Sequence, residues 1–136
     1  MTVICPYCNQ PAKFIDSIQI YNKSFGMVYA CLPCQAWVGV HNGTNKPLGR
    51  LADRKLRMWK QQTHAVFDPI WQGSKNYPNY ENRRSSCYAW LAKKLGISYY
   101  ACHIGMFDIE TCKKAIEICQ KYKHEFIPKG YYAWPR

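Results

Sequence analysis

The sequence lacks any long apolar segment, and this absence narrows the class of protein. No run of apolar residues approaches the roughly 18 that a membrane-spanning helix needs. The first residues, Met1 to Pro6, carry neither the basic head nor the apolar stretch of a signal peptide. We therefore expect a protein that does not enter a membrane and that is located in the cytoplasm.

The chain is also poor in acidic residues. It has 8 Asp and Glu against 19 Lys and Arg, which gives a formal net charge of +11 at pH 7. A chain this basic attracts polyanions, of which nucleic acid is the commonest, and an acidic protein surface is the other candidate partner. A third interpretation is that the charge only keeps the protein soluble.

Sequence motifs of catalysis are missing too. The chain contains no glycine-rich phosphate loop and no recognisable nucleophile motif. A nuclease would need an open metal site or a cluster of acids and bases, and nothing in the spacing of the candidate residues brings them together. These residues are His41, His64, His103 and Asp108. We therefore predict that the protein is not an enzyme, with a nuclease as the least favoured alternative.

Cysteine, by contrast, is abundant, and four of the eight cysteines form a pattern. Cys5 and Cys8 make one pair with two residues between them, and Cys31 and Cys34 make a second pair 22 residues further on. In a reducing compartment such pairs bind metal, because the short gap lets both sulfurs reach one ion. Four thiolates complete a tetrahedral shell and leave no position for water, so we predict one structural zinc. A site in which His41 replaces a cysteine is the alternative.

The residues around these cysteines predict a zinc ribbon over residues 1–47. Apolar and polar residues alternate over 13–20 as in a half-buried strand, residues 27–30 return toward the second pair, and 36–40 form a third strand. The predicted fold class is therefore α+β. A four-cysteine zinc ribbon of three short antiparallel strands is followed by a compact basic part of three helices over 48–136.

Helical periodicity and capping signals place three helices after the ribbon. The first runs from Leu48 to Phe67 and ends at Asp68-Pro69, because the residue before a proline avoids the helical conformation. The second spans about residues 83–95 after a loop at 73–82. The third starts near Asp108, which is a suitable N-cap residue.

Basic side chains gather on the first predicted helix. Helical spacing places three arginines on one face, apart from the apolar stripe and without an acid among them. Arginine suits bidentate contact with phosphate, although an ordinary solvated helix face would show the same pattern. The candidate residues for binding nucleic acid or another partner are Arg50, Arg54, Arg57, Lys60, His64, Arg83 and Arg84.

Three further features leave alternatives open. A second metal site could be drawn from Cys102, His103, Cys112, Cys119 and His124, although buried core positions explain Cys112 and Cys119 more simply. Residues 90–98 are similar to the first helix and turn of a helix-turn-helix, but the helix that follows would carry two glutamates. The segment 129–136 is aromatic and basic, so it could stack on bases or pack onto the fold.

Several stretches of the chain together resemble a known family. They are Cys-Pro-Tyr-Cys (5–8), Ser-Phe-Gly-Met-Val-Tyr (24–29), Cys-Leu-Pro-Cys (31–34), Val-Gly-Val-His-Asn-Gly-Thr (38–44), Ala-Val-Phe-Asp-Pro-Ile-Trp (65–71) and His-Ile-Gly-Met-Phe-Asp (103–108). The chain resembles a family of small zinc-finger-containing-domain proteins, found mainly in phages and bacterial mobile elements. The resemblance implies the four-cysteine zinc site and a phage or prophage setting, hence the cytoplasm of a bacterial host. It implies no catalytic residue and no substrate.

We therefore predict a nucleic-acid-binding accessory protein of phage or prophage origin that contains one structural zinc. The alternative is a phage-encoded inhibitor that binds a protein surface of a host defence complex, in the manner of an anti-CRISPR protein. Exposed Tyr and Trp together with Arg are the residue types that dominate such interfaces.

Overall fold

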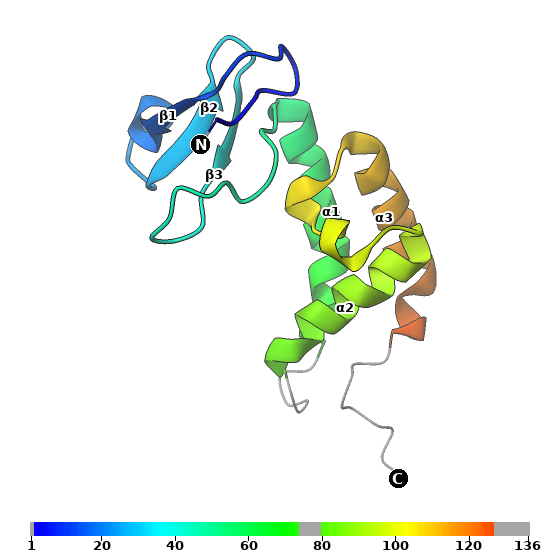
Figure 1. The fold of residues 1–136 in the computed structure, drawn as a ribbon. Helices are drawn as coiled ribbons and strands as arrows, with labels where there is room; N and C mark the ends of the chain where they lie inside the picture. The colour runs from blue at the N-terminus through cyan, green and yellow to red at the C-terminus, as the bar shows by residue number, and fades with distance from the viewer. Residues whose placement is uncertain (1, 74–79, 127–136) are drawn as a thin grey trace. The chain divides into compact units, whose positions relative to one another are not determined.

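The computed structural model describes the backbone of residues 2–73 and 80–126. The chain divides into two compact units, Met1–Met58 and Trp59–Arg136, which we call the ribbon unit and the helical unit. Figure 1 labels their strands and helices. The segment 129–136, for which we expected stacking or packing, lies outside the described residues.

The ribbon unit is built on a three-stranded sheet. Strands β1 (Lys13–Asp16), β2 (Met27–Cys31) and β3 (Ala36–Gly39) lie in that order and pair antiparallel, as Figure 1 shows. Tyr29 in the central strand pairs with Phe14 in β1. The three antiparallel strands of the predicted ribbon are therefore confirmed.

Strand β1 is shorter than the alternating pattern predicted. The Asp16 carboxylate accepts hydrogen bonds from the Ile18 backbone N–H at 2.9 Å and from the Ser24 hydroxyl at 2.6 Å. A short acidic side chain that bonds the nearby backbone competes with the strand, and here it starts a 3-10 turn at Ser17–Gln19. Ile18 and Ile20 therefore lie beyond the strand to which we assigned them.

The ribbon unit extends past residue 47, into the region that we assigned to the helices. Trp37 in β3 exchanges two backbone hydrogen bonds with Ala52, with N–O distances of 3.2 and 3.1 Å, and Val40 bridges to Pro47. The segment before the first helix thus runs beside β3 and brings Leu51 into the core. The buried core of the unit consists of Cys5, Tyr29, Cys31, Ala36 and Leu51.

Helix α1 (Arg54–Gln72) begins later than we predicted. Its N-cap is Asp53, whose carboxylate accepts the Leu56 backbone N–H at 2.9 Å and so satisfies one of the open donors of the first turn. The prediction of a start at Leu48 was wrong because the pairing of Ala52 with β3 keeps the preceding backbone extended.

Helix α1 also continues through Pro69, where we expected it to end. Proline removes one backbone donor and crowds the preceding turn. This position is in the last turn of the helix, and two bonds support the turn there. The Trp71 indole N–H donates to the Asp68 carboxylate at 3.0 Å, and the Gly73 N–H donates to the Pro69 carbonyl at 2.9 Å.

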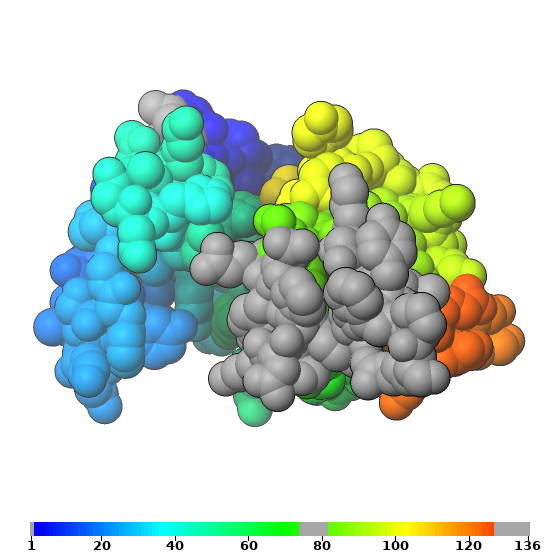
Figure 2. All heavy atoms as spheres, turned by 90° about the horizontal axis from the view of Figure 1, so that it is seen from below, coloured from blue at the N-terminus to red at the C-terminus, as the bar shows by residue number. Residues whose placement is uncertain are grey.

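The helical unit contains helices α2 (Tyr80–Leu95) and α3 (Ile109–Tyr122), with two 3-10 turns between them at Tyr99–Ala101 and Ile104–Met106. In Figure 2 the end of α3, coloured orange, lies on the surface. Three helices after three antiparallel strands confirm the α+β class. The core of the unit includes Phe67, Cys87, Tyr88, Leu91, Ile104, Phe107, Cys112 and Cys119. In the described part of the chain, no helix is long and apolar enough to cross a membrane.

The ends of α2 and α3 follow local signals that the sequence displays. Gly96 closes α2 with a φ of 73°, and the Ile97 N–H reaches back to the Ala92 carbonyl at 3.1 Å. Asp108 caps α3 by accepting the Thr111 N–H at 2.8 Å. Residues 96–108 separate the two helices, whereas a helix-turn-helix joins them by a turn of three or four residues. The helix-turn-helix alternative is therefore not supported.

Candidate metal centre and basic surface

The four cysteines of the two pairs converge at one end of the ribbon sheet. The sulfur atoms of Cys5, Cys8, Cys31 and Cys34 all lie within 4.8 Å of one another, and the Sγ atoms of Cys8 and Cys31 are 3.7 Å apart. A tetrahedral zinc with bonds of about 2.3 Å to sulfur separates its ligands by roughly 3.8 Å. The arrangement therefore fits one zinc ion with four thiolate ligands.

Two similar turns aim these sulfurs at one point. We call them knuckle 1 (residues 5–10) and knuckle 2 (residues 31–35). In knuckle 1 the Asn9 N–H donates to the Cys5 carbonyl at 2.9 Å, and in knuckle 2 the Gln35 N–H donates to the Leu32 carbonyl at 3.0 Å. The residue after each second cysteine is left-handed, with φ of 61° at Asn9 and 51° at Gln35. Asparagine tolerates this conformation, whereas glutamine is strained in it.

The electrostatics of the four thiols require a cation. The backbone N–H of Gln10 bonds to the Cys8 sulfur and lowers the pKa of that thiol. Bonds with the thiols of Cys31 and Cys8, together with burial, raise the pKa of Cys34 to about 12. Four thiols this close do not ionise together unless a positive ion offsets their charge. A soft, purely sulfur donor set suits zinc, and with no open position the metal is structural.

Both knuckles also contact the start of α1. The Tyr7 hydroxyl of knuckle 1 accepts the backbone N–H of Asp53, the N-cap of the helix, at 3.1 Å. The Gln35 carbonyl of knuckle 2 accepts a bond from Arg57 Nη1 at 3.4 Å. The zinc that orders the two knuckles therefore also sets the position of the first turn of α1. The sequence pattern contained no signal for this contact, since the partners are far apart in the chain.

The alternative metal ligands do not assemble. His41 is exposed and does not belong to the sulfur cluster. Within residues 2–73 and 82–126, the four ribbon cysteines are the single group that could hold a metal ion. Burial raises the pKa of Cys102 to about 11 and, with the charge of Cys102 as a smaller cause, the pKa of Cys119 to about 12. These cysteines are buried thiols of the core, as we expected for Cys112 and Cys119.

Arg57, which we placed on a phosphate-binding face, has a structural role in the ribbon unit. Its Nη1 donates to the Ala52 carbonyl at 2.6 Å, and its guanidinium carbon lies 4.0 Å from the centre of the Trp37 ring. A cation over an indole ring at this distance is a favourable contact. Arg57 therefore ties the first turn of α1 to strand β3.

Arg83 cannot contact a partner on the surface, because its side chain is 1% exposed. Its Nη2 lies 3.4 Å from the Ile70 carbonyl, in the last turn of α1, where the negative end of the helix dipole favours a cation. A Cβ at Gly73 would approach that nitrogen to 2.3 Å, so this glycine leaves room for the arginine. The assignment of Arg83 to a binding surface was wrong.

Two further candidates are engaged within the helical unit. The Lys60 ammonium donates to the Gly105 carbonyl at 2.7 Å. The Nδ1 atom of His64 lies 3.2 Å from a carboxylate oxygen of Asp68, one helical turn away. Both contacts stabilise the unit and reduce the capacity of these residues to bind phosphate.

Of the remaining candidates, Arg54 and Arg84 are available to a partner, and so is Lys55 next to Arg54. Arg54 and Lys55, in the first turn of α1, are exposed and form no ion pair or hydrogen bond within the described residues. Arg50 is partly buried, and its Nε has no hydrogen-bond partner in that part of the chain. Arg84 in the helical unit is exposed and lies 5.6 Å from the centre of the Tyr88 ring.

Comparison with known proteins identifies the metal centre and leaves the activity open. A family model described as a zinc-finger-containing domain matches residues 1–122, which include all four ligands and all three helices. No curated protein and no solved structure matches the chain.

Proposed function

The chain belongs to the family of zinc-finger-containing domains, and from that premise we propose that it is a nucleic-acid-binding accessory protein whose ribbon is held by one structural zinc. A phage or prophage origin and a role in the cytoplasm of the bacterial host are part of this proposal. The chemistry of the proposed site is electrostatic and involves no catalytic residue.

The observation that carries the proposal is the placement of cations at the N-terminus of α1. Its first turn contains Arg54, Lys55 and Arg57 and no acidic residue. The Asp53 carboxylate caps the positive end of the helix dipole, and Arg57 is bound to the Ala52 carbonyl. Arg54 and Lys55 are therefore the exposed cations of this turn that remain for a phosphate group. Exposed cations at this end of the helix favour binding of a phosphate-bearing partner over the interpretation that the charge only keeps the protein soluble.

The charge of the ribbon unit supports the same conclusion. Residues 1–58 contain seven Lys and Arg and two Asp, and 7 − 2 gives +5. Four thiolates and one zinc change this by −4 + 2, which leaves +3. The unit therefore stays cationic with the metal bound, and it attracts polyanions at a distance of about one Debye length.

The zinc has a specific place in this proposal. Knuckle 1 holds the N-cap Asp53 through Tyr7, and knuckle 2 accepts a bond from Arg57. A chain without metal loses both supports, so Arg54 and Lys55 are no longer presented on an ordered turn. Binding of nucleic acid is therefore expected to require zinc.

The test is an anisotropy titration of the zinc-loaded protein with single- and double-stranded DNA and RNA, at about 50 and 200 mM salt. We expect Arg54→Glu with Lys55→Glu to weaken binding at least about tenfold and to flatten the salt dependence. Acids in the first turn favour the helix dipole, so this variant should fold at least as stably as the wild type.

The matched control reverses two exposed lysines in the helical unit, Lys93→Glu with Lys114→Glu, for the same change in net charge. We expect a loss of less than about threefold. Equal losses in the two variants would show that only net charge matters. Absence of salt-dependent binding by the wild type would overturn the proposed function.

A protein-binding role is the second candidate, and exposed apolar side chains in the helical unit favour it. Tyr100 is 87% exposed, and Met106 nearby in sequence is 52% exposed. Aromatic residues and methionine are enriched in protein interfaces. In this alternative the protein inhibits a host defence complex by occupying its surface. A host partner that remains bound after nuclease treatment, and that is lost in Tyr100→Ala, would support it.

A nuclease has the least support. The zinc has four thiolate ligands and no position for an activated water. His64 is paired with Asp68, and His103 lies beside the rings of Tyr88 and Tyr99 at centroid distances of 5.0 and 6.0 Å. Cleavage of DNA or RNA that is lost in His64→Ala or His103→Ala would revive this class.

A further inference from the structure

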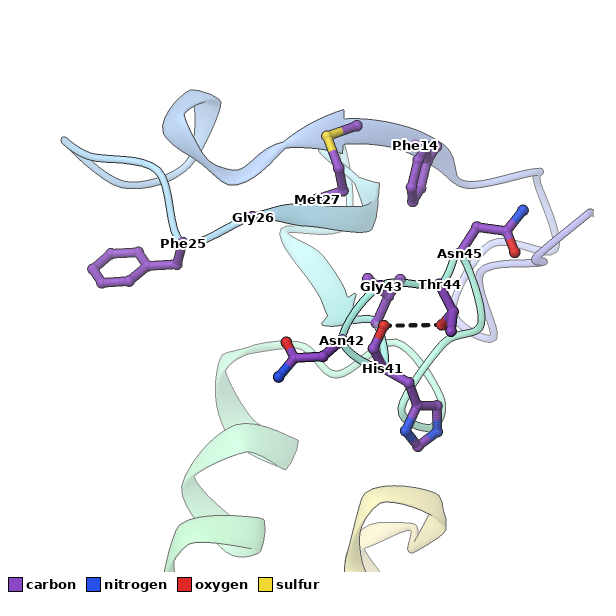
Figure 3. Close-up of a pocket in the computed structure, with 10 residues that line it drawn as sticks. Phe14, Phe25, Gly26, Met27, His41, Asn42, Gly43, Thr44 and Asn45 are labelled. Carbon is purple, nitrogen blue, oxygen red and sulfur yellow. Dashed lines mark hydrogen bonds between the residues drawn. The ribbon is translucent and has the colours of Figure 1, made fainter.

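A hollow of about 610 Å³ lies on the ribbon unit, between the sheet and the turn at residues 41–45. Figure 3 shows the ring of Phe14 pointing from β1 toward this turn, while Phe25 points away from it. The volume is in the range of small-ligand sites. The hollow belongs to a single unit and involves none of the zinc ligands.

We propose that this hollow binds one unpaired base of a single-stranded nucleic acid, with Phe14 as the stacking surface and one of the two amides of Asn42 and Asn45, which extend to opposite sides of the turn in Figure 3, as the group that contacts the base edge. The inference rests on the proposed function and deepens it. It adds a preference for single-stranded over double-stranded nucleic acid, which the basic residues of α1 do not provide.

The ring of Phe14 forms the aromatic surface of the hollow. Phe14 is 43% exposed although it sits in the sheet, and its ring packs on Tyr29 at a centroid distance of 4.8 Å. The hydroxyl of Tyr29 in turn donates to the Asn45 carbonyl at 2.7 Å. One side of the Phe14 ring is therefore supported by protein and the remainder is open. Bases that are not paired stack on such rings, whereas the bases of a duplex are not accessible to them.

The turn at residues 41–45 faces this ring. The His41 N–H donates to the Lys46 carbonyl at 2.9 Å, and the Thr44 N–H and hydroxyl both donate to the His41 carbonyl, at 3.0 and 2.9 Å. These bonds hold the backbone of the turn in one conformation. A preorganised turn loses little entropy when a ligand binds between it and the sheet.

The turn also exposes two polar side chains. The side-chain amides of Asn42 and Asn45 are exposed and have no hydrogen-bond partner within the described residues. Each amide offers both a donor and an acceptor, which is what the edge of a base presents. Asparagine amides are neutral, so they add no electrostatic attraction of their own.

Basic residues accompany the aromatic lining of the hollow. The Lys23 ammonium lies 5.5 Å from the centre of the ring of Phe25, which lines the hollow, and Lys46 follows Asn45 in the chain. The one acid of the sheet, Asp16, accepts hydrogen bonds from Ile18 and Ser24, which fix its carboxylate in place and leave its charge. Cations around an aromatic hollow are the combination that single-strand-binding surfaces use for backbone and base together.

The experiment compares Phe14→Leu with the wild type, because leucine keeps an apolar contact with Tyr29 and removes the flat ring. Zinc content and thermal unfolding establish that the variant is folded. We expect affinity for single-stranded DNA or RNA to fall about tenfold, while affinity for duplex DNA and the salt dependence stay unchanged. Tyr100→Leu is the matched control, at an exposed ring of the helical unit that does not line the hollow, and it should change neither affinity.

A second measurement shows which residues the bound oligonucleotide contacts. In an NMR titration of the full zinc-loaded chain with single-stranded hexamers of thymidine and of uridine, we expect the largest shifts at the side-chain amide of Asn42 or of Asn45. Separate hexamers show whether the site takes DNA, RNA or both. Asn42→Ala and Asn45→Ala should reduce these shifts without changing duplex binding.

The outcomes separate this inference from the proposed function. If the wild type binds no nucleic acid at low salt, both fail. If it binds with a steep salt dependence but Phe14→Leu binds single strands as well as the wild type does, the hollow is not a base site and only this inference fails. Equal losses for single and double strands, or shifts that map away from the turn, overturn it as well.

Discussion

The eight cysteines divide evenly between the two units, and the two sets differ in how their sulfur atoms are arranged. In the ribbon unit the four sulfurs gather within 4.8 Å of one another, and Cys8 is exposed to solvent. In the helical unit all four are buried in apolar surroundings. The difference follows from spacing, since two paired turns bring sulfurs together whereas single cysteines at helical positions pack as small apolar residues.

The two units are also stabilised in different ways. The core of the ribbon unit includes two large side chains, Tyr29 and Leu51, together with cysteine and alanine. A core of this size does not hold a small module by itself, and metal ligation supplies the rest. The helical unit buries larger apolar side chains, among them Phe67, Leu91 and Phe107.

Removal of zinc is expected to have the largest effect. A structural zinc contributes on the order of 10 kcal/mol to the folding of a small module, so chelation or Cys31→Ser should unfold the ribbon unit. We expect the NMR signals of residues 2–53 to move to random-coil positions while those of α2 and α3 remain. One zinc per chain should be released. A simultaneous collapse of both units would contradict the contrast.

Truncation of the helical core is expected to have the next largest effect. Leu91 is fully buried, and Leu91→Ala should destabilise the helical unit by about 3 kcal/mol through lost burial and a cavity. Urea unfolding followed by circular dichroism measures the change. Zinc content should remain one per chain. Ile97→Ala, at a partly exposed position, is the control and should cost well under 1 kcal/mol.

Alkaline pH should weaken the helical unit through its buried thiols. Burial raises the pKa of Cys102 from 9.0 to about 11, so the folded state holds a proton that the unfolded state releases. This contribution is fully present below pH 9 and is lost as pH rises toward about 11, on the order of 2 kcal/mol at most. Urea unfolding at pH 8 and pH 11 measures it, and Cys102→Ala should lose less stability over that interval. An identical loss in the variant would refute the assignment.

Arg57→Ala is expected to have a moderate effect on the ribbon unit. The variant loses the contact with the Trp37 ring and the bond to Ala52, which together stabilise by about 1–2 kcal/mol. Thermal unfolding of the zinc-loaded chain should show a lower midpoint. Arg54→Ala, on the same turn but exposed, should leave the midpoint unchanged. Equal effects would mean that Arg57 is another solvated cation.

The smallest predicted effect compares the two knuckles. Gln35→Gly should stabilise the ribbon unit by a few tenths of a kcal/mol, because relief of the left-handed strain exceeds the added entropy of the unfolded chain. Asn9→Gly should give less, because asparagine already tolerates that conformation. The temperature at which zinc is released provides the measurement. A larger gain at Asn9 than at Gln35 would reverse the expected order.

Local signals explain most of what could be predicted. The Cys-x-x-Cys spacing, the caps at Gly96 and Asp108, and the three strands depend on a few neighbouring residues, and the structure confirms them. The predicted start of α1 was wrong for a non-local reason. Its predicted end was wrong for a local one. Pairing of Ala52 with β3 delays the start, and side-chain support at Asp68 allows Pro69 inside the last turn.

The basic residues show the limit of a one-dimensional pattern. Three arginines with the same side chain have three different environments. Arg54 is exposed, Arg57 is bound to Trp37, and Arg83 is buried against the end of α1. Helical spacing assigns residues to a face and says nothing of what covers that face. The Phe14 hollow was missed for the same reason, because its two sides are far apart in the chain.

The sequence by itself determined the metal centre, because four thiolates at two short spacings leave a single arrangement that satisfies their charge and geometry. It also determined the α+β order of elements and the cationic balance of the chain. Only the tertiary structure decided which cations reach solvent, how the knuckles hold the first turn of α1, and where an aromatic ring faces a rigid turn. These properties depend on contacts between distant residues, and such contacts form only when the chain is folded.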